Sequence, residues 1–316
     1  MTALRIGIGL PGADGAPHGG RVAEAARWIE DAGLDAIGVS EVLTGDGTPA
    51  LEPVVTLTTA AAVTQRVHLD FGVLAASARP AAMLAAQVQT LQHLSGGRVR
   101  LGLGIGGFAA SPFWAALDAP TTGRGRAFDA LLEVLPGLIS GTPTTVPTAT
   151  GHIEVTLAPA VPAPPILVGG SDHEAVLRRT ARYGDAWLPF AMSPEQLAAG
   201  AARLRELAAK YGRTSPEVHV GLHAVLGDSP ADRAAAARMR ETLGAFYGLP
   251  ADEMAGATLA GQPDQVADRL AEYAAAGVHE VGIALDGEDV ERQIELAGEV
   301  RRLIPARGPA PAAALR

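Results

Sequence analysis

The sequence predicts an α/β protein built as a (β/α)8 TIM barrel. Three observations support this fold: strand and helix signals alternate, the strand segments are short continuous apolar runs, and the length is suitable. Parallel strands that are buried on both faces have continuous rather than alternating apolar residues. A barrel of this kind takes about 250 residues before insertions, and the chain has 316. An open, doubly wound sheet of eight strands is the alternative, because periodicity alone does not distinguish the two.

The expected strands recur at intervals of about 30 residues, with one or more helical segments between them. Gly33 ends the first helix, and Gly96 with Gly97 ends the third, because glycine adopts the left-handed C-cap conformation at little cost. The expected strands are residues 5–10, 35–40, 67–74, 98–103, 166–168, 186–188, 218–226 and 280–285. The expected helices are residues 20–32, 51–65, 81–94, 126–140, 172–183, 194–211, 230–248, 263–276 and 290–303.

Three insertions account for the length beyond a minimal barrel. The first follows the fourth strand, where residues 108–123 hold two prolines and predict a loop. The second, residues 142–159, precedes the fifth strand and predicts a hairpin or an extended loop. The third follows the seventh strand. We expect one domain, residues 1–304, and a frayed tail, residues 305–316.

Composition argues against several classes of function. The net charge is -9 and Lys210 is the only lysine, so we expect no binding to nucleic acid or to an anionic membrane. The absence of cysteine excludes disulfides and thiolate chemistry. The histidines show no metal-ligand spacing, so no metal site is expected. The sequence has no leader pattern and no apolar run approaching about 18 residues, which predicts a cytoplasmic protein.

Two glycine triplets match the dinucleotide fingerprint GxGxxG. They are Gly7, Gly9 and Gly12, and Gly102, Gly104 and Gly107. The fingerprint works only where the third glycine opens a helix, and loop-like residues follow both triplets. An NAD(P)-dependent dehydrogenase is therefore only an alternative. Glycines on one face of the strand 98–103 instead allow another backbone, or a flat ligand, to approach that strand closely.

Seven segments, in chain order, resemble landmarks of the bacterial luciferase-like oxidoreductases. They are DAIGVSEVLTG (35–45), TTAAAVTQRVHLDFGVLA (58–75), RPAAMLAAQVQTLQHLSGGRVRLGLGIGG (79–107), RGRAFDALLEVLPGLISG (124–141), PPILVGGS (164–171), YGDAWLP (183–189) and GQPDQVADRLAEYAAAGVHEVGIAL (261–285). The resemblance covers about residues 4–300. It implies a (β/α)8 barrel, in agreement with the strand count, and a cofactor that is either reduced FMN or the deazaflavin coenzyme F-420.

The resemblance implies a cofactor site at the C-terminal ends of the strands, where TIM barrels hold their active sites. Relatives that use the deazaflavin have a bulge at the end of the third strand, often with a non-prolyl cis peptide that supports the ring. The corresponding bond here is Gly72–Val73, and the alternative is a regular trans strand. The implied cofactor-binding residues of the third and fourth strands are Gly72, Val73, Leu74, Gly104, Gly106 and Gly107.

The loop after the fifth strand is the candidate phosphate site. Gly169 and Gly170 leave backbone amides bare, and Ser171 or Asp172 would cap the following helix. Free amides at a helix N-terminus bind phosphate directly. The resemblance implies that Gly169, Gly170 and Ser171 hold the cofactor phosphate, whereas the residues alone also suit an ordinary strand-to-helix turn.

Two residues are candidate catalytic groups. Glu41 lies just past the second strand, where a carboxylate could bind substrate or move a proton; the alternative is an ion pair with Arg79. Many relatives have a histidine directly after this acid, whereas this chain has Val42, and His18 in the loop after the first strand could replace it in space. Gly107 stands where deazaflavin-dependent sugar-phosphate dehydrogenases of the family have a catalytic glutamate, which disfavours that substrate class.

Together the sequence predicts an oxidoreductase that oxygenates a small organic substrate or exchanges a hydride with it. F-420 is slightly favoured over FMN, and a flavin or F-420 reductase would supply reduced cofactor. A catalytically degenerate flavin-binding partner subunit is the alternative that Val42 and Gly107 support. A homodimer is expected through the helices 51–65 and 81–94, whose residues 60–63 and 81–86 form alanine-rich faces.

Overall fold

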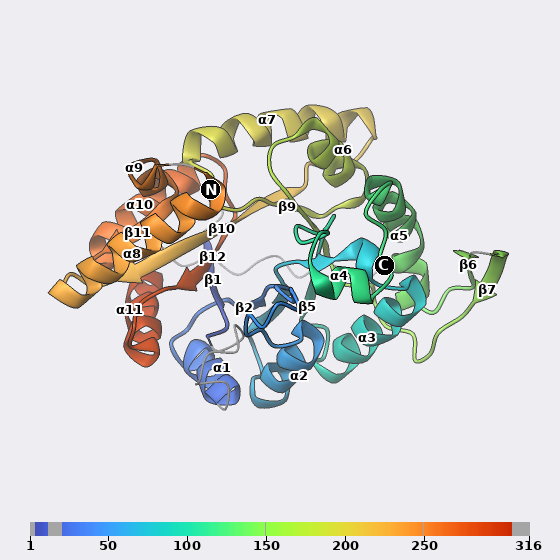
Figure 1. Cartoon of the computed structure of the whole chain (residues 1–316), viewed down its shortest axis with the longest axis horizontal. Helices are drawn as coiled ribbons and strands as arrows, with labels where there is room; N and C mark the ends of the chain where they lie inside the picture. The colour runs from blue at the N-terminus through green and yellow to red at the C-terminus, as the bar shows by residue number, and fades with distance from the viewer. Residues whose placement is uncertain (1–3, 12–20, 149, 249, 305–316) are drawn as a thin grey trace.

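The computed structural model describes residues 4–11, 21–148, 150–248 and 250–304, and it confirms the barrel (Figure 1). Eight strands form a closed ring of parallel ladders. In ring order they are β1 (Arg5–Gly9), β2 (Ala36–Val39), β3 (His68–Phe71), β5 (Val99–Gly104), β8 (Ile166–Gly169), β9 (Ala186–Leu188), β10 (Glu217–Leu226) and β12 (Glu280–Leu285). The pairing of β9 with β10 completes the ring, so the open, doubly wound alternative is wrong.

Helices surround this ring in chain order (Figure 1). They are α1 (Val22–Asp31), α2 (Pro53–Val63), α3 (Ala81–Leu94), α5 (Arg124–Ile139), α6 (Glu174–Tyr183), α7 (Pro194–Lys210), α8 (Pro230–Tyr247), α10 (Pro263–Ala275) and α11 (Val290–Leu303). All nine predicted helices are present, with ends shifted by at most two residues. Within the described ranges, no helix is long and apolar enough to cross a membrane.

The structure differs from the prediction at the third strand. Strand β3 ends at Phe71, and a short strand β4 (Leu74–Ala75) resumes the parallel pairing with β5. The two residues between them, Gly72 and Val73, leave the ladder. The predicted continuous strand 67–74 is therefore wrong, and the predicted bulge at its end is confirmed.

The three insertions also contain structure of their own. The segment 108–123, predicted as a loop, includes the short helix α4 (Pro112–Ala116), which Ser111 caps by accepting from the Trp114 amide at 3.2 Å. The predicted hairpin is formed by β6 (Thr144–Thr148) and β7 (Gly151–Val155), which project from the barrel (Figure 1). After β10 the sequence analysis missed α9 (Ala251–Met254) and β11 (Thr258–Gly261), an extra parallel strand on the C-terminal half of β10.

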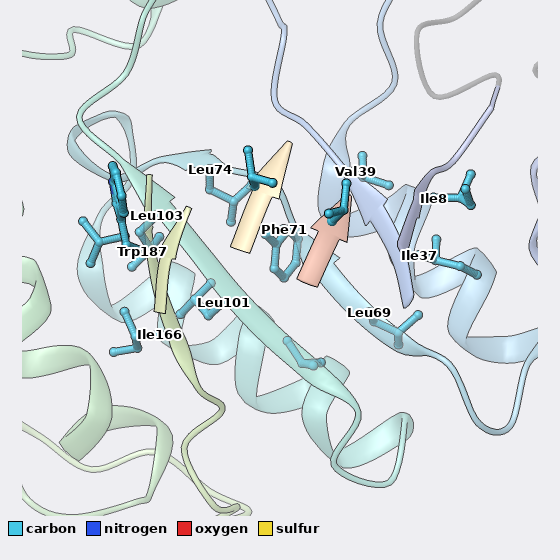
Figure 2. Close-up of a cluster of buried hydrophobic side chains, with 14 of the residues drawn as sticks. Ile8, Ile37, Val39, Leu69, Phe71, Leu74, Leu101, Leu103, Ile166 and Trp187 are labelled. Atoms are coloured by element: carbon cyan, nitrogen blue, oxygen red, sulfur yellow. The ribbon is translucent and has the colours of Figure 1, made fainter. Parts of the chain in front are cut away.

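The apolar core is a shell between the barrel strands and the surrounding helices. Figure 2 shows part of it, where side chains from neighbouring strands pack together. Phe71, Leu101 and Trp187 in this region are fully buried. Because successive side chains of a strand point to opposite faces, the intervening residues face the barrel interior.

The N-terminal half of the barrel interior holds a group of charged residues, called here the charged layer. Its members are Arg5, Asp70, Arg100, Glu217, His219 and Glu280. Arg100 is central, because its Nε donates to Asp70 Oδ1 at 2.6 Å and its Nη1 to Glu280 Oε2 at 2.5 Å. Burial alone would raise the pKa of Glu280, but Arg100, His219 and Arg5 outweigh it and hold this pKa below its usual range.

Candidate active site

A cavity of about 340 Å³ lies inside the barrel above the charged layer. It extends from Asp70 and Glu280 to residues beyond the C-terminal ends of β1, β2, β9 and β12. Apolar residues such as Leu10, Val42 and Ile283 contribute to its wall. The position at the C-terminal end of the barrel is where enzymes of this fold bind their substrates.

A layer of glycines explains why this cavity exists. Gly282 of β12 lies opposite Gly7 of β1 on one side and Gly221 of β10 on the other. TIM barrels normally fill such a layer with bulky side chains, whereas this glycine layer (Gly7, Gly221 and Gly282) contributes none. The Phe190 ring covers Gly221, since a Cβ added there would lie 2.5 Å from Phe190 Cδ2. A Cβ added to Gly282 would meet nothing closer than the Val220 carbonyl oxygen at 3.9 Å.

The peptide bond Gly72–Val73 is cis, as the sequence resemblance predicted. The Gly72 carbonyl accepts a hydrogen bond from Ser40 Oγ at 2.8 Å, and Gly72 itself lines the cavity. Leu74 is fully buried in the core (Figure 2), so its side chain faces away from the cavity. The contact of Gly72 and Val73 with a cofactor stays a prediction.

The glycines of β5 and β8 make room for the chain itself. A Cβ added to Gly102 would overlap the Phe71 carbonyl oxygen. Added to Gly104 it would lie 2.9 Å from Val73 Cγ2, and added to Gly169 it would lie 2.8 Å from Val73 Cγ1. Of the two interpretations of this glycine face, close approach of another backbone is therefore confirmed, and the bulge occupies the space beside Gly104.

Glu41 forms the predicted ion pair with Arg79. Its other carboxylate oxygen accepts from the Ala75 amide at 2.6 Å, and its own amide donates to the Val73 carbonyl at 3.2 Å. The Glu41 side chain is 7% exposed. Glu41 thus contacts the bulge at Val73 and at Ala75, and each of its two carboxylate oxygens has a partner. The other candidate catalytic residue, His18, lies outside the described residues.

The Gly106 and Gly107 positions differ in their surroundings. Gly106 has a φ of +90°, and a Cβ there would lie 2.5 Å from the Trp114 ring of α4. Gly107 has no atom within 4 Å of such a Cβ. Both line a second cavity of about 80 Å³, together with Phe108 and Trp114. An aromatic chamber therefore lies next to the bulge, because Val73 also lines this cavity.

The loop after β8 differs from the prediction in two details. Helix α6 begins at Glu174 with His173 as its N-cap, and no side chain caps it, so the predicted cap by Ser171 or Asp172 is wrong. The Gly170 amide donates to the Leu188 carbonyl at 3.3 Å and is therefore not bare. Among the described residues, no acceptor bonds the amides of Ser171, Asp172 and His173. These three exposed amides, rather than that of Gly170, suit an anion.

Sequence reasoning missed one polar pair in the cavity. His223 Nδ1 of β10 lies 2.6 Å from Oδ2 of Asp286, which directly follows β12. His219, Gly221 and His223 alternate along the inner face of β10, and an acid follows the last strand. This alternation was the signal available in the sequence, but the strand register that joins the two residues was not.

The chain matches known proteins over most of its length. A family model described as luciferase-like monooxygenase matches residues 4–280. An uncharacterised protein of Mycobacterium tuberculosis is 36% identical over 179 residues, which cover 55% of this chain and 60% of that protein's length.

Two solved structures share the fold. A structure described as an F420-dependent secondary alcohol dehydrogenase in complex with an F420-acetone adduct has a TM-score of 0.79 at 18% identity, covering 95% of this chain and 98% of that one. The oxygenating constituent of 3,6-diketocamphane monooxygenase from Pseudomonas putida, described in complex with FMN, has a TM-score of 0.76 at 16% identity, covering 96% and 99%. Because the family model spans most of the residues, this chain belongs to the luciferase-like monooxygenase family of oxidoreductases.

Proposed function

We propose that this protein is an oxidoreductase that uses F-420 or reduced FMN on a small organic substrate, with F-420 as the favoured cofactor. The observation that carries the proposal is the barrel cavity, which is open at Gly282 and has Gly72 of the bulge on its wall. The sequence resemblance implies that this bulge supports the cofactor ring. Structural neighbours described with F420 and with FMN support both cofactor classes.

The described residues suit a flat ring that carries a phosphate. The open position at Gly282 leaves room for a planar group, and Gly72 would support it from one side. The exposed amides of Ser171 and Asp172, before the N-terminus of α6, would hold the phosphate. When bound, the cofactor supplies the hydride or oxygen chemistry. The chain's own residues bind the ring, keep water away and orient the substrate.

Parallel titrations test this proposal. The purified protein is titrated with reduced FMN and with F-420, and binding is followed by fluorescence. We expect F-420 to bind more tightly than FMN. Tighter binding of FMN would assign the protein to oxygen chemistry with a partner reductase. Binding of neither cofactor at tens of micromolar would contradict the proposal and leave only the fold.

The second candidate function is a flavin-binding partner subunit without turnover. The observation that favours it is the ion pair of Glu41 with Arg79, which occupies the acid that a catalytic role would need. This candidate predicts cofactor binding with no reaction on any substrate, and a stable complex with a related chain. For the NAD(P) alternative, no helix begins at Gly107, and Gly12 of the other triplet lies outside the described residues.

We also propose a homodimer through α2 and α3. Of the alanine-rich segments expected at the interface, Ala60, Ala61 and Ala85 pack inward, whereas Ala62 is exposed and Ala86 lies at the surface between the helices. Val55, Met83 and Leu94 of these helices are also exposed. A shallow cavity of about 280 Å³ lies between the two helices, lined by Val54, Thr58, Ala86, Gln87, Thr90, Leu91 and Leu94. Sedimentation equilibrium tests the proposal, and a monomer at all concentrations would contradict it.

A further inference from the structure

The pair formed by His223 and Asp286 lies in the barrel cavity but has no role in the cofactor site described above. We propose that His223, held by Asp286, is the catalytic residue that exchanges a proton with an alcohol or carbonyl oxygen of the substrate. The inference rests on the proposed function, because the proton transfer would accompany a hydride transfer in the same cavity. It goes beyond that function by naming the group that moves the proton and the chemical class of the substrate.

The barrel framework fixes both side chains. His223 lies opposite Ala284 in the ladder between β10 and β12. The Asp286 amide donates to the Ala224 carbonyl at 2.9 Å, which attaches the residue after β12 to β10. The Phe190 ring meets the imidazole edge-on, with 5.3 Å between the ring centroids and 89° between the planes. Catalytic groups on rigid strands that are supported from several sides keep their geometry without reorganisation.

The contact with Asp286 determines which nitrogen of His223 is available. A carboxylate accepts a hydrogen bond, so Nδ1 carries the hydrogen and the neutral ring keeps its lone pair on Nε2. Among the described residues, none forms a hydrogen bond with Nε2 of His223. The His223 side chain is 21% exposed and that of Asp286 is 32% exposed. A carboxylate behind the ring also stabilises the imidazolium that forms when Nε2 takes a proton.

The charges around the pair indicate an uncharged substrate. From α8, Arg238 lies with His223 and Asp286 around an adjoining cavity of about 290 Å³, and its Nη2 is bonded to Glu288 Oε1 at 2.8 Å. Among the described residues, no lysine or arginine lines the barrel cavity. A carboxylate or phosphate on the substrate would find no lysine or arginine on this wall and would face the carboxylates of Asp70, Glu280 and Asp286. Apolar residues and the Nε2 acceptor of His223 instead suit a small alcohol or ketone.

The atoms and electrons of the alcohol oxidation balance when the F-420 of the proposed function is the hydride acceptor. For an alcohol, the O–H bond breaks and its proton passes to His223 Nε2. The C–H bond on the same carbon breaks, and its electron pair leaves as a hydride to oxidised F-420. The carbon–oxygen double bond forms, so the alcohol is oxidised and the deazaflavin is reduced. In the reverse direction His223 returns the proton to the carbonyl oxygen.

The decisive variant is His223→Asn. The asparagine amide can still donate to Asp286 from a position near Nδ1, but it has no counterpart of Nε2. A structural role of His223 would therefore survive this change, whereas a catalytic role would be lost. The matched control is His152→Asn, on the exposed hairpin strand β7. His223→Gln and Asp286→Asn complete the series, and thermal unfolding confirms that each variant is folded.

Two measurements are made on each variant. The first is F-420 binding by fluorescence. The second is turnover of a series of secondary alcohols, propan-2-ol to octan-2-ol, with F-420 across pH 5 to 9. We expect all variants to bind F-420 within about twofold of wild type. We expect kcat to fall by about 10²–10⁴-fold in His223→Asn and His223→Gln, the usual contribution of general acid–base catalysis. The control keeps wild-type kcat. In an additional variant, His223→Ala, added imidazole is expected to restore part of the activity.

A positioning residue has a different signature. Asp286→Asn is expected to lower kcat without raising KM, and to change the shape of the pH profile of kcat, because the carboxylate stabilises the protonated imidazole. In cofactor-free protein with ¹⁵N-labelled histidine, NMR is expected to find the hydrogen of neutral His223 on Nδ1 in wild type. A hydrogen on Nε2 would overturn the proposal without any activity measurement.

The outcomes separate the two proposals. No binding of F-420 or FMN to wild type means that the proposed function fails. Binding with full turnover in His223→Asn means that the proposed function stands and this inference fails. Binding without turnover of any alcohol, or of the corresponding ketones with reduced F-420, excludes the substrate class and overturns the inference as well.

Discussion

Two walls of the same barrel use glycine for opposite purposes. On the wall formed by β3, β5 and β8, Gly102 accommodates the Phe71 carbonyl, and Gly104 and Gly169 accommodate the Val73 side chain. On the wall formed by β1, β12 and β10, the equivalent space at Gly282 stays open and forms the cavity. One wall is filled by the chain's own bulge and the other is left for a ligand.

A glycine in a buried strand therefore does not by itself indicate a ligand site. In both walls the absence of a Cβ lets another group approach closely. Whether that group is the chain or a ligand depends on the neighbouring strand, and here on the two residues that leave the ladder after β3. Substitutions at matched glycines of the two walls therefore test the comparison directly.

The largest effect is expected for Gly102→Ala. The added Cβ overlaps the Phe71 carbonyl oxygen, and a backbone atom between two barrel strands cannot move aside as a side-chain end can. We expect the free energy of unfolding to fall by about 4 kcal/mol or more, which is the range of exceptional substitutions. Urea unfolding followed by circular dichroism measures this change.

Gly282→Ala is the matched control for Gly102→Ala. Its Cβ would lie 3.9 Å from the nearest atom, so we expect a change within about 1 kcal/mol, since an alanine also suits a strand better than a glycine does. Equal destabilisation by the two alanines would show that the walls do not differ.

The next effect concerns the charged layer beneath both walls. Glu280→Gln removes a carboxylate that Arg100 and Arg5 both contact, and leaves these buried guanidinium groups undercompensated. We expect a loss of about 3 kcal/mol at neutral pH. The loss should be similar with the cavity open or occupied, because these residues form the floor of the cavity and not its wall.

The pH dependence of this loss has a definite sign. The pKa of Glu280 is held below its usual range in the folded protein. Its stabilising contribution is therefore fully present above about pH 4.3, the ordinary glutamate pKa, and is lost as the pH falls through the lower folded-state pKa. Unfolding curves of wild type and Glu280→Gln should converge in acid. A stability difference that grows on acidification would contradict this assignment.

A smaller effect, on binding rather than stability, is expected for Gly282→Val. A branched side chain in the glycine layer would occupy part of the cavity, while valine is well suited to a buried strand. We expect F-420 to bind at least about tenfold more weakly, equivalent to about 1.4 kcal/mol. Fluorescence titration measures the affinity, and thermal unfolding serves as the control for folding. Unchanged affinity would place the ring elsewhere.

Much of the fold could be predicted from the sequence because it depends on local patterns. Short apolar runs and glycine-terminated helices gave the eight strands and nine helices, and α3 and β12 have the predicted bounds. The strand β11 was missed because its four residues, TLAG, are too short and too weakly apolar to stand out. Its partner is the C-terminal half of β10, a contact that no local pattern encodes.

The candidate site was less accessible to sequence reasoning because it depends on register. The sequence predicted the cis bond at Gly72–Val73 only through the family resemblance, and it offered Glu41 as either a catalytic group or an ion-pair partner. The pairing of His223 with Asp286 joins residues 63 positions apart. Only the alignment of β10 with β12 brings them together, so composition and spacing did not indicate the pair.

The smallest predicted effect concerns the end of the filled wall, where Ser171 follows Gly169 and Gly170. Ser171 forms no cap for α6, whereas Ser193 caps α7 by accepting from the Gln196 amide in a capping box. We expect Ser193→Ala to cost about 1 kcal/mol and Ser171→Ala to leave stability unchanged, as measured by urea unfolding. Equal losses would mean that Ser171 is a cap in solution and that the loop is an ordinary turn. Unchanged stability together with a weaker affinity for F-420 in Ser171→Ala would instead indicate that this loop binds the cofactor phosphate, with the filled wall supporting the ring and its loop holding the phosphate.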